Sequence, residues 1–83
     1  MKKKQIHEVV DVKLLHGYVV ECVFDDLTQG AVDLKPFLGR GIFRDLLDKR
    51  KFKQLRVDAE LGTLCWPNGA DVAPETLYQL AKK

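Results

Sequence analysis

The chain has 83 residues, of which 14 are Lys or Arg, 12 are Asp or Glu and 46% are apolar. This length fits a single small domain over residues 1–83, and the charge-rich composition with a net charge of only +2 excludes the disordered class. Apolar runs stop at three residues, so no membrane contact is expected, and no apolar stretch of signal-peptide length follows Lys2-Lys3-Lys4. We therefore expect a cytoplasmic protein with a flexible basic N-terminus at residues 1–5.

Alternating apolar residues predict two half-buried strands, over residues 6–15 and 18–25. The buried sets expected from this alternation are Ile6, Val10, Val12 and Leu14 in the first strand, and Tyr18, Val20, Cys22 and Phe24 in the second. Because only His16-Gly17 separates the strands, they should form an antiparallel hairpin, and a third strand over residues 30–34 should complete a meander.

The apolar period changes after Pro36, which cannot donate a ladder hydrogen bond. Leu38, Ile42 and Leu46 are spaced by four, as are Phe43 and Leu47. This stripe predicts an amphipathic helix over Ile42–Lys49 with an irregular first turn.

Two short strands are predicted next, over residues 55–60 and 63–66, followed by a tight turn and a helix that begins at Pro74. The fold class is therefore α+β. We expect a small, mostly antiparallel curved sheet, the element order β-β-β-α-β-β-α, and helices packed on one face.

The sequence shows no catalytic, cofactor-binding or metal-binding motif. His7 and His16 lie far apart along an extended strand, so we predict surface histidines that do not share a metal ion. Cys22 and Cys65 form no CxxC pair and are expected to be reduced core residues.

Six basic residues against two acids give the segment from Arg44 to Arg56 a local charge of +4. The basic residues are Arg44, Lys49, Arg50, Lys51, Lys53 and Arg56. An acidic protein partner, nucleic acid and a merely solvated surface all remain open for this segment. Phe52 lies within it, and Trp66 is either a core residue or an exposed anchor. Phe52, Trp66 and the six basic residues are thus the candidate partner-binding set.

The stretch from Trp66 to Tyr78 (Trp-Pro-Asn-Gly-Ala-Asp-Val-Ala-Pro-Glu-Thr-Leu-Tyr) resembles the C-terminal signature of a bacterial family, domain of unknown function 2442. The resemblance extends from about Val9 to Leu80. One departure is visible: the family usually has Asp-Gly in its second turn, where this chain has Asp26-Leu27.

The signature also has a structural interpretation. Its members are Trp66, Pro67, Asn68, Gly69, Asp71 and Pro74. Trp66 would fill the core, Pro67-Asn68-Gly69 would form the turn, and Asp71 would cap the last helix, which Pro74 begins.

The resemblance implies small proteins that are often encoded beside another short protein, as in toxin–antitoxin pairs, and it carries over no catalytic residue. Our leading hypothesis is a non-enzymatic interaction or antitoxin-like protein that binds a small protein partner and forms a homodimer. The alternatives are a nucleic-acid-binding regulator that uses residues 44–56 and a small enzyme that uses Asp58, Asp71 or Glu75.

Overall fold

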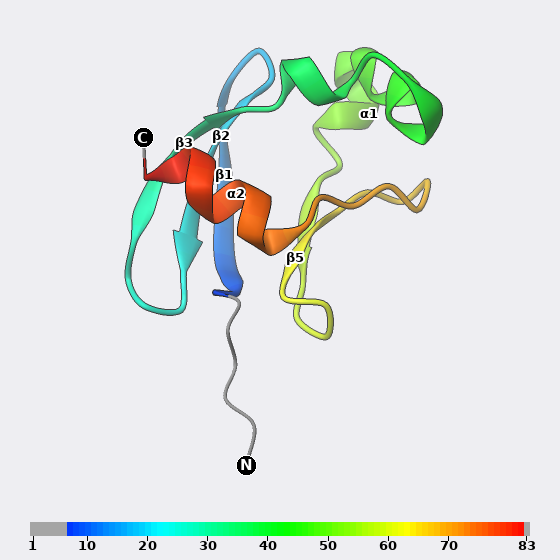
Figure 1. The fold of residues 1–83 in the computed structure, drawn as a ribbon. Helices are drawn as coiled ribbons and strands as arrows, with labels where there is room; N and C mark the ends of the chain where they lie inside the picture. Colours follow the sequence, from blue (N-terminus) through cyan, green and yellow to red (C-terminus); the bar gives the residue numbers. More distant parts are fainter. Residues whose placement is uncertain (1–6, 83) are drawn as a thin grey trace.

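The computed structural model describes residues 7–82, so the predicted flexible residues 1–5 lie outside the described part of the chain. Three strands form one antiparallel sheet in the order β1-β2-β3, namely β1 (Val9–His16), β2 (Val19–Phe24) and β3 (Gln29–Asp33) (Figure 1). Two more strands pair separately, β4 (Arg56–Asp58) and β5 (Thr63–Cys65). The helical segments are the 3₁₀ helices η1 (Lys35–Phe37) and η2 (Gly41–Leu47) and the α-helices α1 (Lys49–Phe52) and α2 (Pro74–Ala81).

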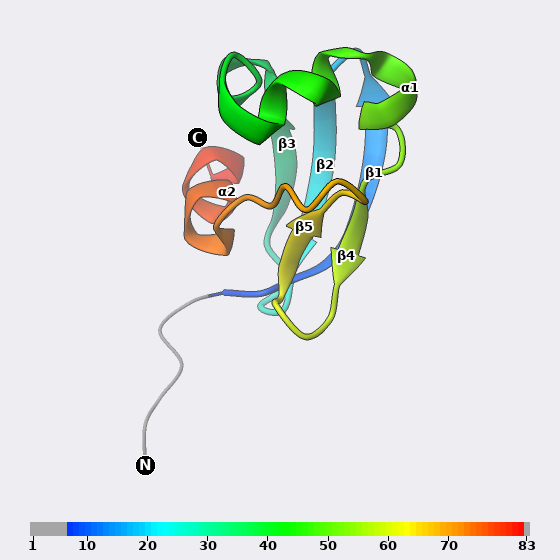
Figure 2. The same cartoon turned by 90° about the vertical axis from the view of Figure 1, so that its right-hand side faces the viewer.

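The α+β class and the meander are confirmed, but the five strands form two sheets where one was predicted. β4 and β5 have three residues each, too few to extend the ladder along the eight residues of β1. A backbone hydrogen bond from Val9 N to Gly62 O (2.9 Å) joins the smaller sheet to the start of β1. Figure 2 shows this small sheet beside the lower end of the three-stranded one.

A β-bulge changes which residues of β1 are buried. The register shifts between Val9 and Asp11, so Val9 is buried and Val10 is 53% exposed. The prediction that Val10 faces the core is therefore wrong, because an extra residue in one strand turns the chain before it to the other face. In β2 the alternation holds, with Val20, Cys22 and Phe24 all buried.

The predicted amphipathic helix over Ile42–Lys49 is replaced by η2 and the short α1. A 3₁₀ helix has three residues per turn, so Phe43 and Leu46 turn inward together while Ile42 and Leu47 remain 48% and 45% exposed. Asp48 ends η2 with an extended backbone, and its carboxylate accepts the Arg50 N–H (2.9 Å), which caps α1.

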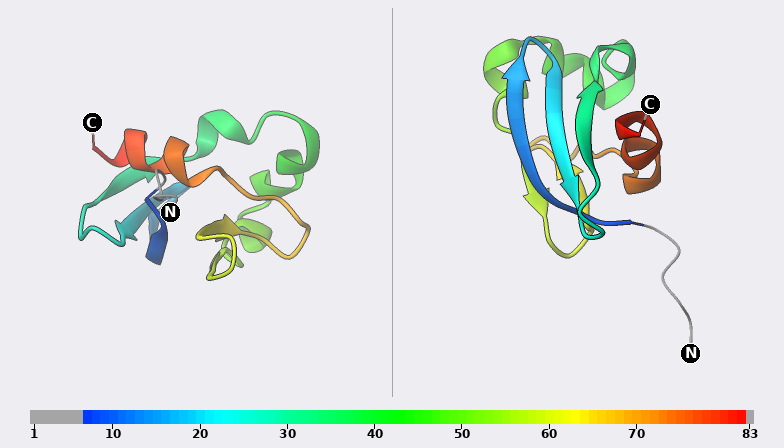
Figure 3. Two further views of the ribbon diagram at one scale, coloured as in Figure 1. Left: turned by 60° about the horizontal axis from the view of Figure 1, so that its bottom comes forward. Right: turned by 90° about the vertical axis from the view of Figure 1, so that its left-hand side faces the viewer.

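The core lies between the inner face of the three-stranded sheet and the elements that cover it. α2 packs against β3 and β2 through Leu77, η2 and α1 cover one end, and β4–β5 lie at the other (Figures 1 and 3). No element of the described chain covers the outer face of the three-stranded sheet (Figure 3, right). None of the helices within residues 7–82 has the length and apolar character needed to cross a bilayer.

Both cysteines are free and buried, as predicted. Burial, and to a smaller extent the neighbouring Glu21 carboxylate, raises the pKa of the Cys22 thiol to about 12. A thiol with this pKa is a poor nucleophile at neutral pH, so Cys22 contributes packing to the core.

Gly30 lets α2 lie directly on β3. A methyl group at Gly30 would collide with the backbone carbonyl of Ala81 at the end of α2, whereas one at Gly39 would meet no atom within 4 Å. Because backbone cannot rotate away as a side chain can, we expect Gly30→Ala to lower the free energy of unfolding by about 1–3 kcal/mol. Urea denaturation measures this change. Gly39→Ala is the matched control, and equal stabilities for the two variants would contradict the packing described.

Candidate functional site

Trp66 organises the region where the basic segment meets the Trp-Pro-Asn-Gly turn. Its side chain is only 2% exposed and its indole N–H donates to the carbonyl oxygen of Phe52 (3.0 Å). The rings of Phe52 and Phe43 contact it at centroid distances of 5.7 and 6.3 Å. Of the two alternatives left open for Trp66, the structure has the core residue. Phe52 is fully buried too, so its place in the candidate partner-binding set is corrected: both rings belong to the core.

The turn after Trp66 is fixed by its own backbone and by Asn68. Gly69 has a left-handed backbone (φ 94°) and its N–H donates to Trp66 O (3.0 Å). The Asn68 side chain accepts the Ala70 N–H (3.0 Å) and donates to Ile42 O (3.2 Å). The turn is therefore attached to η2, and it brings the exposed Ile42 side chain beside Gly69.

A pocket of about 310 Å³ opens where these elements meet. Its lining residues come from η2, α1, the turn that follows α1 and the Trp-Pro-Asn turn: Asp45, Leu46, Lys51, Gln54, Trp66, Pro67 and Asn68. The two features that the sequence singled out, the basic segment and the aromatic signature, thus border the same cavity. A pocket with an apolar floor and a few polar groups at its rim is suited to receiving one side chain of a partner.

All six predicted basic residues are exposed to solvent. Arg50 lies 3.6 Å from the Asp48 carboxylate, and the Lys49 ammonium lies 5.4 Å from the centre of the Tyr18 ring. Lys51 reaches the pocket rim. The basic segment therefore borders the pocket through Lys51.

Asp71 does not have the capping role that the sequence suggested. Ala73 occupies the N-cap position of α2 without a side-chain hydrogen bond, and Asp71 instead forms an isolated antiparallel bridge with Cys65. The buried Thr63 hydroxyl donates to the Val72 carbonyl and holds this segment against β5. Pro74 begins α2 as predicted.

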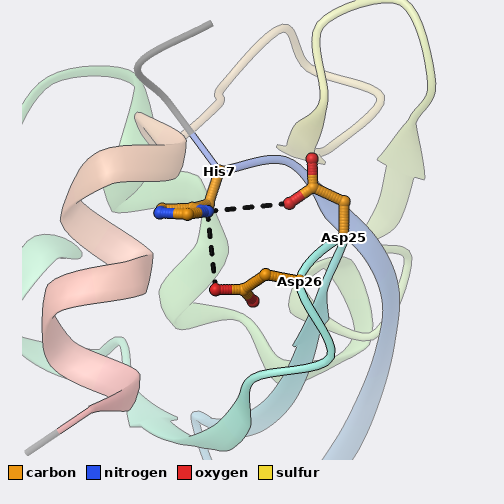
Figure 4. Close-up of side chains that lie close together, drawn as sticks. All are labelled: His7, Asp25 and Asp26. Atoms are coloured by element: carbon orange, nitrogen blue, oxygen red, sulfur yellow. Dashed lines mark ion pairs between the residues drawn. The ribbon is translucent and has the colours of Figure 1, made fainter.

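A second cluster of polar side chains lies at the β2–β3 turn, where the sequence predicted only turn residues and a surface histidine. The Nδ1 atom of His7 lies 3.7 Å from Asp25 Oδ1 and 3.6 Å from Asp26 Oδ2 (Figure 4). The His7 ring stacks on Tyr78 of α2 at 4.0 Å, and the Tyr78 hydroxyl donates to Asp26 Oδ2 (2.6 Å). His7, Asp25 and Asp26 are together able to offer three ligand atoms to a metal ion.

The profile of a family described as "Protein of unknown function (DUF2442)" matches residues 9–83. The chain belongs to this family. The match confirms the resemblance stated from the sequence, while no curated protein and no solved structure matches the chain. In this DUF2442 protein, the pocket beside Trp66 and the His7–Asp25–Asp26 cluster are two places where described side chains converge.

The carboxylates named for an enzyme belong to different elements of this DUF2442 protein. Asp58 accepts the backbone N–H groups of Glu60 and Leu61 in the β4–β5 turn, so its carboxylate stabilises that turn. Asp71 lies in the bridge to Cys65, and Glu75 belongs to the first turn of α2.

Tyr78 controls the ionisation of Asp26. The Tyr78 hydroxyl, followed by the Thr28 N–H, lowers the pKa of Asp26 from 3.8 to about 2. Because this pKa is lower in the folded state, the ionised carboxylate stabilises the fold above about pH 4, and this contribution is lost as the pH falls towards 2.

We expect Tyr78→Phe to return the Asp26 pKa towards 3.8, which an NMR titration of the side-chain carboxyl would measure in metal-free buffer. The matched control is Tyr18→Phe, since the Tyr18 hydroxyl donates to Leu47 O (2.5 Å) and does not contact Asp26. An unchanged Asp26 pKa in Tyr78→Phe would contradict the assignment.

Proposed function

We propose that this protein is a non-enzymatic binding domain that docks an acidic protein partner on the basic segment and the pocket beside Trp66. The observation that carries the proposal is the placement of that pocket, which is bordered by Lys51 of the exposed basic segment and by the Trp-Pro-Asn turn that Asn68 attaches to η2. The gene arrangement that the family resemblance implies, with another short protein encoded alongside, supports a partner that is itself small.

Exposed apolar side chains on η2 favour a protein as the partner. Ile42 and Leu47 are half exposed on η2, and Ile42 is held next to the turn by the hydrogen bond from Asn68. A protein interface typically combines an apolar centre with a polar rim, and the pocket floor with Ile42 gives the centre while the basic residues give the rim.

Charge determines which kind of protein fits. The segment from Arg44 to Arg56 has six basic residues and two acids. A symmetric homodimer through this surface would place the same positive segments opposite each other, which is unfavourable, so we assign the surface to a different, acidic protein. Nucleic acid is the second candidate because the same six cations are exposed to solvent.

The experiment is co-expression with the small protein encoded beside this chain in its native genome, followed by a measurement of affinity and of its salt dependence. We expect a 1:1 complex that Lys51→Glu/Lys53→Glu weakens about tenfold or more, because repulsive rim charges slow association. Gln54→Trp, which fills the pocket from its exposed rim, should weaken the complex without disturbing the core.

Lys13→Glu is the control, since Lys13 is an exposed cation on β1 outside the basic segment. Equal affinities for the control and the basic-segment variants would contradict the proposed surface. Binding to DNA or RNA that is lost in Lys51→Glu/Lys53→Glu but retained in Gln54→Trp would assign the segment to nucleic acid instead. Failure of the neighbouring protein to bind would overturn the antitoxin-like role.

A further inference from the structure

We propose that His7, Asp25 and Asp26 bind a divalent transition-metal ion such as Zn²⁺. The cluster lies at the β2–β3 turn against α2, where the three labelled side chains converge on one point (Figure 4). It combines one imidazole nitrogen with two carboxylate oxygens, a donor set that zinc and related ions use in proteins.

The separations between the donor atoms are close to those of a coordination shell. His7 Nδ1 lies 3.7 Å from Asp25 Oδ1 and 3.6 Å from Asp26 Oδ2, and all three atoms lie within 4.8 Å of one another. Two ligands about 2.1 Å from a tetrahedral ion lie about 3.4 Å apart, so small rotations of these side chains suffice. Three protein ligands leave a coordination position for water, as in open zinc sites.

The backbone and α2 hold the donors in place before any ion binds. Asp25 N donates to Glu8 O (2.9 Å), which fixes the residue beside His7 against the end of β2. Stacking on Tyr78 (4.0 Å between ring centres) fixes the plane of the His7 ring. The Tyr78 hydroxyl orients Asp26 Oδ2, in the role of the outer hydrogen-bond partner found around many metal-bound carboxylates.

In the described part of the chain, the Asp25 carboxylate has no structural role in the turn that would account for its position. The Asp26 carboxylate stabilises the turn by accepting the Thr28 N–H (2.9 Å), but within residues 7–82 the Asp25 carboxylate interacts only with His7. No Lys or Arg among the described residues forms an ion pair with either carboxylate. Among the described residues, these two adjacent negative charges beside an imidazole therefore form no ion pair with Lys or Arg, and a divalent ion would neutralise them.

An ion would reach the carboxylates from solvent, because Asp25 and Asp26 are both exposed, and a cavity adjoins His7 on its α2 side. The cavity has a volume of about 350 Å³ and is lined by His7, Glu75, Tyr78 and Gln79. His7 thus lies between the carboxylates of the turn and an open space on α2. This cavity is separate from the pocket beside Trp66, so the inference does not rest on the proposed docking function.

The test is isothermal titration calorimetry of the untagged full-length chain with Zn²⁺, and absorption spectroscopy with Co²⁺ to report the coordination geometry. We expect 1:1 binding and a melting temperature that rises with Zn²⁺ concentration. Asp25→Asn and His7→Gln should each lower the affinity by about tenfold or more, and Tyr78→Phe, which keeps the ring stacking, by about tenfold. Mg²⁺, which prefers oxygen ligands, should not compete.

His16→Gln is the matched control, because His16 is an exposed histidine at the other end of β1. Melting curves of the metal-free variants establish that each one folds; Asp25 is exposed and outside the turn hydrogen bonds, so Asp25→Asn should retain the wild-type melting temperature. Absence of binding at millimolar Zn²⁺, or affinity that Asp25→Asn and His7→Gln leave unchanged, would overturn the proposal. Loss of binding in His16→Gln alone would assign the ion to a different, adventitious site.

Discussion

The burial of Trp66 is the interaction on which the rest of the structure depends. Its ring fills the space between β5 and the helical segments, and its N–H satisfies the Phe52 carbonyl at the end of α1. A four-residue helix has too few internal hydrogen bonds to persist alone, so this bond and the packing of Phe52 determine where α1 lies. The pocket and the position of Lys51 at its rim follow from that placement.

A second constraint operates at Tyr78 of α2. Tyr78 contacts three parts of the chain: its ring packs edge-on against Phe24 of β2 and stacks on His7, and its hydroxyl reaches Asp26 in the β2–β3 turn. The eight-residue α2 is therefore attached to the sheet by an aromatic side chain as well as by Leu77. The two clusters are built independently, one around Trp66 and the other around Tyr78.

The sequence predicted those parts of the fold that depend on local patterns. Alternation identified β2 with the correct buried face, Pro74 marked the start of α2, and the hairpins followed from short turns. Spacing alone did not separate a 3₁₀ helix from an α-helix over residues 41–47, because apolar residues spaced by three and by four both occur there. Alternation does not predict the bulge at Val10, because Val9 and Val10 are both apolar and either one could face the core.

The candidate sites also combine features that a local sequence pattern predicts with features that depend on distant parts of the chain. The basic segment is local in sequence, so its exposure was predictable, whereas its pocket required Trp66 and Asn68 to meet it from another part of the chain. The cluster around His7 depends on residues more than fifty positions apart, including Tyr78, and no motif spacing connects them. The Asp26-Leu27 departure from the family pattern was visible in the sequence; the structure shows Leu27 with a left-handed backbone (φ 75°), where glycine is usual.

The stacking of His7 on Tyr78 also means that the first and last described segments of this chain meet, although 71 positions separate the two residues. Because these two described segments are in contact, a peptide linker could connect them. New termini opened at a surface turn such as the one at Leu27, whose side chain is 84% exposed, would then leave every strand pairing in place. The same three-dimensional arrangement of strands and helices is thus compatible with a different order of these elements along the chain.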